Sequence, residues 1–595
     1  MKPELLAPAG SAEALLAAIR CGADAVYLGG GAFNARAAAP NFKRPALEDA
    51  GRLCKSHGVK LYFTLNTLLS DRELPQALAL AEEAVRAGAD AIIVQDLGLL
   101  RLLHGAWPHL PLHASTQCST QTAGGMALLK ELGAARCIVP RECSKDELEA
   151  LVENAPLELE AFVHGALCMS VSGQCLLSHA LGGRSGNRGT CAQPCRLPWA
   201  MHNAQMHAVP CTGHNCLSLK DLSLLDEVNQ PPLGRMAALK IEGRLKRPEY
   251  VAAAVTAFRH ALDGTQSPVS GEDLRRTFSR SGFTRGYYEG GRSAEMFGTR
   301  RREDAAPPET LRRMAALYAE ETSDRRGVQQ ATRAPNQSHV SPAGGRNAAP
   351  TAGISGTVLR FLSHKQIPDN IPKDAQIFLP CDTPPELVKK YRAQVTIPAG
   401  VFGEYDKILV QLRRAREAGA SLAMAQTLDG IALAREAGLG PVAGEGMNVL
   451  NSACLEALGA LGAAGAVLSA EMNAAQARDL RGRIPFGAMA YGRLALMLCR
   501  NCPVKAQIGC KACRNSGSLI DRRGTVFPVR CEGACARVYN SRPLWLADVQ
   551  GKLSALGFRL YAFTTESREE CAAVLRAYQN GAACKGEFTR GWMKS

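Results

Sequence analysis

The feature that most constrains the fold is a unit repeated through the first 265 residues: a short apolar run, a polar turn and an amphipathic helix. Eight apolar runs of strand length occur, at residues 4–10, 25–30, 61–66, 91–96, 112–116, 136–140, 159–165 and 238–244. Several of the Ala-rich helical patterns between them end in Gly-Ala-Asp, which suits a helix C-cap followed by a turn. Strands that alternate with helices form parallel sheets, so eight units predict an α/β fold of the closed TIM-barrel type. An open, doubly wound sheet is the weaker alternative.

Barrel geometry indicates where chemistry is expected, because TIM-barrel active sites lie at the C-terminal ends of the strands. Those ends are rich in polar residues here, and we expect the catalytic groups to be Arg141, Glu142, His164, Lys240, Glu242 and Arg244. The arginines suit a carboxylate ligand, since a guanidinium group binds a carboxylate through two parallel hydrogen bonds. For Glu142 and Arg244 the alternative is a structural ion pair that closes the barrel.

Four cysteines follow the seventh predicted strand with the spacing C-x6-C-x15-C-x3-C, at Cys168, Cys175, Cys191 and Cys195. The sequence shows neither the apolar core of a signal peptide nor the roughly 18 apolar residues of a membrane span. We therefore expect a cytoplasmic protein with no membrane association, in which clustered cysteines usually bind metal or do redox chemistry. The wide first spacing fits an iron–sulfur cluster at least as well as zinc. The alternatives are Cys168 as a nucleophile with His164 as its base, and chance packing.

The chain is basic, with 70 Lys and Arg against 55 Asp and Glu, a net charge of +15 and a pI near 9.0. Such an excess favours a polyanionic partner, and RNA is the obvious one in the cytosol. Because the charge is spread out rather than gathered in one patch, a basic protein that binds no nucleic acid stays an alternative.

Five motifs lie along the predicted barrel: ELLAPAG at 4–10, STQ at 115–117, EAFVHGALCMSVSGQC at 160–175, NRGTCAQPCR at 187–196 and LKIEGRLKRPEYV at 239–251. They resemble peptidase family U32, historically called collagenase-like proteases. The resemblance covers the whole predicted barrel. It is most specific around the cysteines and around the eighth strand.

The resemblance implies an oxygen-independent hydroxylase rather than a protease. Family members studied chemically act on RNA or on ubiquinone precursors and carry a four-iron, four-sulfur (4Fe–4S) cluster on four cysteines. Residue by residue, those cysteines fall on Cys168, Cys175, Cys191 and Cys195. Some relatives take the fourth ligand from further downstream, where this chain has Ser223, while the nearby Cys211 and Cys216 match no recognised pattern. The cluster either keeps one iron open or relays electrons.

The resemblance also implies prephenate as hydroxyl donor, oriented by the charged groups at the barrel mouth, and an electron donor such as a ferredoxin. This chain resembles the longer, rRNA-modifying members, so we expect 5-hydroxycytidine formation in 23S rRNA. The alternatives are a tRNA uridine hydroxylase, a peptidase and a non-catalytic RNA-binding protein stabilised by metal. The aromatic residues of FTRGYYEGG at 283–291 either stack a base or lie in a surface loop.

The second half of the chain resembles the first. LGAARCIVPREC at 132–143 resembles LGAAGAVLSAEM at 461–472, an offset of 329, and AFVHGALC at 161–168 resembles AMAYGRLA at 488–495, an offset of 327. Two matches in the same order predict a duplicated barrel unit, with chance similarity of Ala-rich strings as the alternative. Arg141, His164 and Cys168 are replaced by Ala, Tyr and Ala, and only Glu142 persists, as Glu471. We therefore expect a degenerate barrel that supports substrate binding or the active-site wall.

These patterns divide the chain into a barrel at 1–265, a helical and basic appendix at 266–321, a flexible linker at 322–355 and a second α/β half at 356–595. The second half has a Cys-rich insert at 499–535, with C-x2-C-x7-C-x2-C at Cys499, Cys502, Cys510 and Cys513. Two C-x2-C pairs predict a structural zinc site, and a second iron–sulfur cluster is the alternative. Cys531 and Cys535 follow a predicted hairpin at 521–530 and leave six candidates for four ligands.

Overall fold

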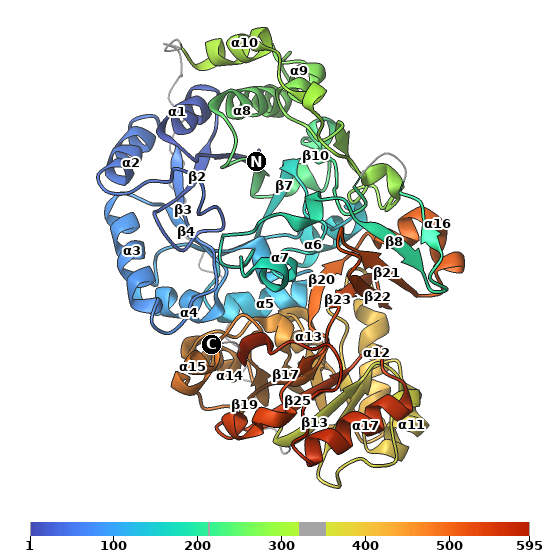
Figure 1. Ribbon diagram of the computed structural model, residues 1–595. Helices are drawn as coiled ribbons and strands as arrows, with labels where there is room; N and C mark the ends of the chain where they lie inside the picture. The colour runs from blue at the N-terminus through green and yellow to red at the C-terminus, as the bar shows by residue number, and fades with distance from the viewer. Residues whose placement is uncertain (1, 212–214, 320–352, 594–595) are drawn as a thin grey trace.

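The computed structural model describes residues 2–211, 215–319 and 353–593, which form two barrels packed against each other (Figure 1). The first barrel is a sheet of eight parallel strands in which the last strand, β11, pairs with both β1 and β7 and closes the ring. Its strands are β1 (Glu4–Pro8), β2 (Ala25–Gly29), β3 (Lys60–Leu65), β4 (Ala91–Val94), β5 (Leu112–Ala114), β6 (Arg136–Ile138), β7 (Glu158–Ala166) and β11 (Ala238–Ile241). All eight predicted strands are present, so the TIM-barrel prediction is confirmed and the open sheet is wrong.

Helices surround this barrel, and four of them begin at polar caps. Ser11, Asp96, Thr122 and Ser144 each accept a backbone N–H bond from the first turn of the helix that follows. The helices are α1 (Ala12–Arg20), α2 (Ala46–Ser56), α3 (Leu74–Arg86), α4 (Leu97–Ala106), α5 (Ala123–Glu131), α6 (Lys145–Asn154) and α8 (Pro248–Asp263).

The Gly-Ala-Asp turns return the chain from helix to strand. Gly22 and Gly88 adopt φ angles of 107° and 91°, which favour glycine. Asp24 then accepts the backbone N–H of Leu5 at 2.8 Å, and Asp90 makes the same bond to β3 at 2.7 Å. Each turn therefore ends a helix and fixes the next strand beside the preceding one.

The second barrel is also complete. Eight parallel strands close through pairing of β18 with β19. They are β13 (Gly356–Phe361), β14 (Gln376–Pro380), β15 (Gln394–Thr396), β16 (Leu422–Ala425), β17 (Gly440–Ala443), β18 (Gly465–Val467), β19 (Phe486–Gly492) and β25 (Phe558–Phe563). Its helices include α11 (Pro385–Tyr391), α12 (Tyr405–Glu417), α13 (Leu428–Glu436), α14 (Ser452–Ala460), α15 (Ala474–Asp479) and α17 (Arg568–Gln579). The expected degeneracy therefore does not extend to the strand count.

The strand order agrees with a duplication. β6 and β18 are the sixth strands of their barrels, and β7 and β19 are the seventh. In both barrels a long excursion separates the seventh strand from the eighth. The sequence matches between the two halves therefore fall on equivalent elements.

The two excursions join in a third, antiparallel sheet with the order β20-β23-β22-β21-β8-β9. The first half contributes β8 (Ala200–Asn203) and β9 (Ala208–Val209). The second half contributes β20 (Ala495–Cys499), β21 (Ser516–Ile520), β22 (Val526–Glu532), β23 (Cys535–Tyr539) and the helix α16 (Pro503–Cys513). β21 and β22 form the hairpin predicted around 521–530. The long loops of the two barrels are therefore one structural unit.

Equivalent helices also form the contact between the barrels. α4 packs on α14, and α5 packs on α13. Asn451 donates to Asp96 at 2.8 Å, and Thr122 donates to Asp429 at 2.8 Å, in a buried setting at both places. The interface thus repeats one arrangement twice, as expected for a duplicated barrel.

The region after the first barrel contains α9 (Gly271–Thr277) and α10 (Pro308–Ala319), which pack on α8, and α10 also reaches α1 (Figure 1). Of the predicted linker at 322–355, residues 322–352 lie outside the described residues. None of the helices in the described ranges combines the length and apolar character needed to cross a bilayer.

Candidate active site at the mouth of the first barrel

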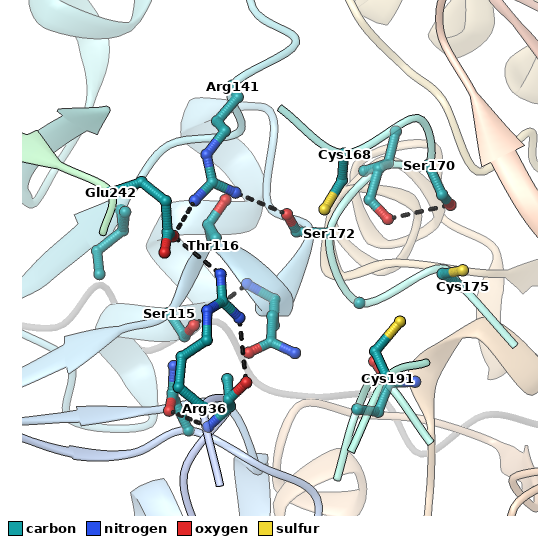
Figure 2. A pocket seen from close by; sticks show the side chains of 18 of the residues that line it. Arg36, Ser115, Thr116, Arg141, Cys168, Ser170, Ser172, Cys175, Cys191 and Glu242 are labelled. Carbon is teal, nitrogen blue, oxygen red and sulfur yellow. Dashed lines mark hydrogen bonds and ion pairs between the residues drawn. The ribbon is translucent and has the colours of Figure 1, made fainter. Parts of the chain in front are cut away.

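A cavity of about 170 Å3 lies at the C-terminal ends of the first barrel's strands, where the TIM-barrel prediction puts an active site. Figure 2 shows the charged side chains on one side of it and the thiols on the other. The main polar residues of its lining are Arg36, Asn66, Ser115, Thr116, Gln117, Arg141, Lys240, Glu242, Arg244 and the cysteines 168, 175, 191 and 195. Four of the six predicted catalytic residues and all four predicted cluster ligands therefore meet in one cavity.

Glu242 is held between two arginines. Its Oε2 atom lies 2.8 Å from Arg141 Nη2 and 3.0 Å from Arg36 Nη2. Burial favours the protonated acid, but Arg36 and Arg141 outweigh it and lower the pKa of Glu242 to about 2. Glu242 is therefore ionised and keeps both guanidinium groups in place. Arg141 Nε is buried with no partner among the described residues, which leaves this side of the cavity short of acceptors.

Arg244 follows the eighth strand and is buried. It donates to Thr64 Oγ1 at 2.9 Å and to Asn34 Oδ1 at 3.1 Å. Burial and then the charge of Arg36 lower the pKa of Arg244 to about 10. A Cβ on Gly10 would overlap the carbonyl oxygen of Arg244, so the last residue of ELLAPAG allows this close approach.

Lys240 lies deeper, in the barrel interior. Its Nζ atom is 2.8 Å from Glu160 Oε1, and both side chains are buried. Burial, opposed by this partner, lowers the pKa of Lys240.

The hydrogen-bond partners of Arg244 are the neutral side chains of Thr64 and Asn34 and do not include Glu142. The alternative of a structural ion pair between Arg244 and Glu142 is therefore wrong.

The four cysteines face the cavity from the loop after β7. The sulfur atoms of Cys168, Cys175 and Cys191 surround one open space in Figure 2, and Cys195 completes the lining. Burial raises the pKa of Cys175, and its three neighbours raise it further. Burial also raises the pKa of Cys195 to about 11, against the opposing charge of Arg196. The thiols therefore lie within electrostatic reach of one another.

The four thiols are soft donors, which both iron–sulfur clusters and single metal ions such as zinc use. One zinc ion draws four sulfurs to about 2.3 Å from a common point. In the described part of the chain, no group of three or more His, Cys, Asp or Glu side chains is placed to hold a metal ion in that way. In a 4Fe–4S cluster each thiolate binds its own iron, so the sulfurs stand apart around a shared space. Cys195 lines this space, whereas Cys211 and Cys216 do not.

The second half forms part of the cavity wall, as expected for a supporting barrel. Met497 of β20 lines the cavity, and its backbone forms an antiparallel β-bridge with Cys175. The backbone N–H of Leu176 donates to Leu496, and that of Val171 donates to Leu498, both at 2.8 Å. The cysteine loop is thus held along one strand of the second half.

Two predicted catalytic residues lie outside the cavity lining. Glu142 is 2% exposed, burial raises its pKa to about 7, and its backbone carbonyl accepts from Arg500. His164 packs against Tyr250, Phe258 and Phe283; burial lowers its pKa to about 3. The structure therefore does not bring His164 to Cys168, and neither predicted group faces the cavity.

Arg36 and Met497 are among the lining residues that sequence reasoning missed, and it overstated one motif. Arg36 lies in an irregular loop after β2, where nothing in the sequence marks it among the other arginines. Met497 comes from the other half of the chain. In FTRGYYEGG, Tyr287 and Tyr288 are 2% and 4% exposed, so they pack inside the protein instead of offering a surface for a base.

The C-terminal cysteines form a series of electrostatic neighbours that includes a fifth thiol. Cys499 lies in β20, paired with Ala536, and burial and then the charges of Cys502, Cys175 and Cys535 raise the pKa of its thiol. Burial and then Cys513 and Cys510 raise the pKa of the Cys531 thiol, and Cys531 and Cys513 add to the raised pKa of Cys502. A kink at Gly509, with φ 73°, folds α16 back toward its own start. Cys502 thus lies within electrostatic reach of both Cys499 and Cys531.

The fold and this site define a class of protein: a TIM barrel with four thiols and an arginine–carboxylate group at its mouth. The model of peptidase family U32 matches residues 10–297. The chain is 32% identical over 313 residues to "Collagenase" of Porphyromonas gingivalis, a match that covers 49% of this chain and 75% of that protein. The chain belongs to peptidase family U32.

Two further relatives have names that refer to RNA. The chain is 40% identical over 263 residues to "23S rRNA 5-hydroxycytidine C2501 synthase" of Escherichia coli strain K12, covering 44% of this chain and 39% of that protein. It is 34% identical over 271 residues to "tRNA hydroxylation protein P1" of Bacillus subtilis strain 168, covering 44% of this chain and 63% of that protein. The chain therefore spans less than two thirds of the length of each of these two relatives.

Proposed function

We propose that the protein is an iron–sulfur RNA hydroxylase that works without oxygen. The observation that carries the proposal is that all four predicted thiol ligands line the same cavity as the Arg36–Glu242–Arg141 group. The names of the Escherichia coli and Bacillus subtilis relatives support RNA as the substrate. Cys168, Cys175, Cys191 and Cys195 would hold the 4Fe–4S cluster, which supplies redox or Lewis-acid chemistry when bound.

The residues of this chain bind and orient the donor. Arg36, Arg141 and Arg244 oppose one carboxylate, Glu242, so the side chains of the charged wall carry an excess of two positive charges. Prephenate has two carboxylates and suits this wall, since guanidinium groups bind carboxylates through paired hydrogen bonds. Thiolates and cluster add negative charge on the opposite wall, which favours the donor on the arginine side. We also propose that an electron donor such as a ferredoxin is a partner of the protein.

We propose 5-hydroxycytidine in 23S rRNA as the product, because the chain carries a net charge of +15 and a second barrel. The test is mass spectrometry of nucleosides from the rRNA and tRNA of a deletion strain. The proposal expects 5-hydroxycytidine to disappear from rRNA and to return with the wild-type gene. Loss of 5-hydroxyuridine from tRNA alone would reassign the substrate, and no change in either RNA would contradict the function.

The peptidase alternative has less geometric support. It needs a base in contact with the nucleophile, and His164 is buried away from the cavity that Cys168 lines. The name "Collagenase" of one relative is the observation that keeps it testable. Cleavage of gelatin by the purified protein, abolished in Cys168→Ser, would favour the peptidase.

We further propose a structural zinc ion in the second half, held by Cys502, Cys510, Cys513 and a fourth thiol, either the predicted Cys499 or Cys531. The support is the electrostatic contact of Cys531 with Cys510 and Cys513, and the hydrogen bond of 3.3 Å from its N–H to Asn515, next to the end of α16. Zinc would draw the four thiols together and stabilise the fold directly. Zinc per protein should fall in Cys502→Ser, and a matching loss in either Cys499→Ser or Cys531→Ser identifies the fourth ligand.

A further inference from the structure

A second cavity, of about 320 Å3, begins where the active-site lining ends along the chain. Arg244 lines the active-site cavity, and the next three residues, Leu245 to Arg247, line the second one. Its lining includes Lys246, Arg247 and Arg300 but no Asp or Glu. The cavity is therefore cationic, and it adjoins the proposed catalytic site.

These three cations lack carboxylate partners. Within the described residues, none of them forms an ion pair, whereas nearby Arg280 is held by Asp221 at 2.6 Å. Arg300 donates from Nη2 to the carbonyl of Asp304 at 3.2 Å, and its Nη1 atom is buried without a partner. A buried guanidinium donor without an acceptor is costly, so an acceptor is expected from outside the chain.

An aromatic ring holds two of the cations in place. Lys246 Nζ lies 2.7 Å from the centre of the Phe278 ring, and Arg300 Cζ lies 4.0 Å from it. Cation–π contact of this kind stabilises a charge but does not neutralise it. Burial and then the charge of Arg280 lower the pKa of Lys246 to about 7, with Asp221 opposing this shift and Arg300 adding to it. Because Asp221 is paired with Arg280, the charges of Lys246 and Arg300 still repel each other.

The start of α8 also lies at this cavity. The helix has 16 residues, begins at Pro248 directly after Arg247 and has no side-chain cap, while Glu249 in its first turn opposes part of its positive potential. The N-terminus of a helix carries a partial positive charge and offers unpaired N–H groups, which favour phosphate. Three side chains and one helix terminus therefore point to the same ligand chemistry.

We propose that this cavity binds a phosphate group, and that the phosphate belongs to the RNA strand beside the nucleotide in the active-site cavity. The choice of RNA rests on the proposed function, whereas the choice of phosphate rests on the cavity alone. Tyr250, which lines the second cavity, donates to the backbone carbonyl of Glu242 at 2.9 Å. This bond joins the second cavity to the backbone of Glu242, whose side chain lines the active-site cavity.

The test uses the full-length protein and the double variant Lys246→Ala/Arg300→Ala. The matched control, Arg483→Ala/Arg523→Ala, removes the same charge from exposed positions outside this cavity. Binding of an rRNA fragment is measured by fluorescence anisotropy over a range of salt concentrations. We expect the Kd of the cavity variant to rise roughly tenfold and its salt slope to fall by about 1, because one phosphate contact is lost.

A second arm separates the two parts of the proposal. Inorganic phosphate should raise the Tm of the wild type and of the control variant but not that of the cavity variant. If the cavity variant binds RNA as tightly as the control, the RNA assignment is overturned. If phosphate raises the Tm of both variants equally, or of neither the variants nor the wild type, the phosphate site is overturned. A wild type that binds phosphate here but no RNA would contradict the proposed function and leave the phosphate site standing.

Discussion

The two barrels share one strand plan but differ in their interiors. The first contains a buried ionic network, in which Glu160 lies 2.8 Å from Lys240 and 3.5 Å from Arg136, and Arg136 lies 3.0 Å from the partly buried Glu4. The second contains an apolar cluster made by Ile354, Val358, Phe378, Leu422, Met424, Val442, Ala464, Val467, Phe558 and Leu560. The second barrel also holds the buried pair of Arg360 and Glu445 at 2.6 Å, so both barrels bury charge and the first buries the larger network. Glu4 and Arg136 are the first residues of β1 and β6, so this network begins at the end of the barrel opposite the mouth.

The mouths of the two barrels also differ, because the first has a charged side chain and a thiol where the second has alanine. Arg141 and Cys168 line the cavity of the first barrel, and their equivalents in the second half are Ala470 and Ala495. Glu142 is the exception, since its equivalent Glu471 remains an acid. Burial raises the pKa of both carboxyl groups to about 7. The shared acid thus belongs to the common fold, and the residues that differ belong to the site.

The largest expected effect concerns the buried pair of the first barrel. Lys240→Met leaves Glu160 with Arg136 at 3.5 Å as its remaining cationic partner, which should lower the free energy of unfolding by about 3 kcal/mol. Urea unfolding measures this loss. The double variant Lys240→Met/Glu160→Gln should recover part of the stability, because no unpaired charge remains. A single variant as stable as the wild type would show that the ionic network is dispensable.

Next in size is the loss of a mouth arginine. Arg141→Ala removes one of the two guanidinium groups that hold Glu242 and face the proposed donor, and should lower the hydroxylation rate roughly 10²-fold. The folded protein and its iron content should be unchanged. Arg493→Ala, in the second half, serves as the control and should keep activity near that of the wild type. Equal activity in Arg141→Ala would remove the charged wall from the mechanism.

The shared acid predicts a smaller, pH-dependent effect. Because burial raises the pKa of Glu142 to about 7, its protonated form stabilises the fold at low pH, and this stability is lost as pH rises from about 4.5 to 7. Glu142→Gln should therefore gain stability relative to the wild type, by about 2 kcal/mol more at pH 8 than at pH 4. Glu471→Gln should show the same sign. A gain that is independent of pH would contradict the buried-acid account.

The smallest effect concerns the contact through which the second barrel holds the cysteine loop. Ser185 donates to Glu471 Oε1 at 2.7 Å, so Ser185→Ala should cost about 1 kcal/mol and leave iron content near that of the wild type. Limited proteolysis of the loop and urea unfolding measure this change. The exposed Ser554→Ala is the control. Complete loss of iron in Ser185→Ala would mean that the bond has a larger role than anchoring.

The first barrel and its thiols were predictable because their signals are local in sequence. Apolar runs at regular intervals set the strands, and the cysteines lie within one loop. Arg36 was not predictable, since only the closed barrel brings the loop after β2 to Glu242. Pairing of β8 with β21 joins residues more than 300 positions apart, and no local pattern encodes it. His164 was misjudged because a strand end does not say whether its side chain faces the mouth or the helices.

The central claim is that iron–sulfur chemistry resides in the first barrel. The most direct measurement is iron per chain in protein purified without oxygen, compared between the wild type, Cys191→Ser and Cys531→Ser. The account predicts about four irons in the wild type and in Cys531→Ser, and a loss of most iron and visible absorption in Cys191→Ser, since a hydroxyl cannot replace a soft thiolate. Full iron in Cys191→Ser with loss in Cys531→Ser, or a colourless wild type filled with zinc, would contradict it.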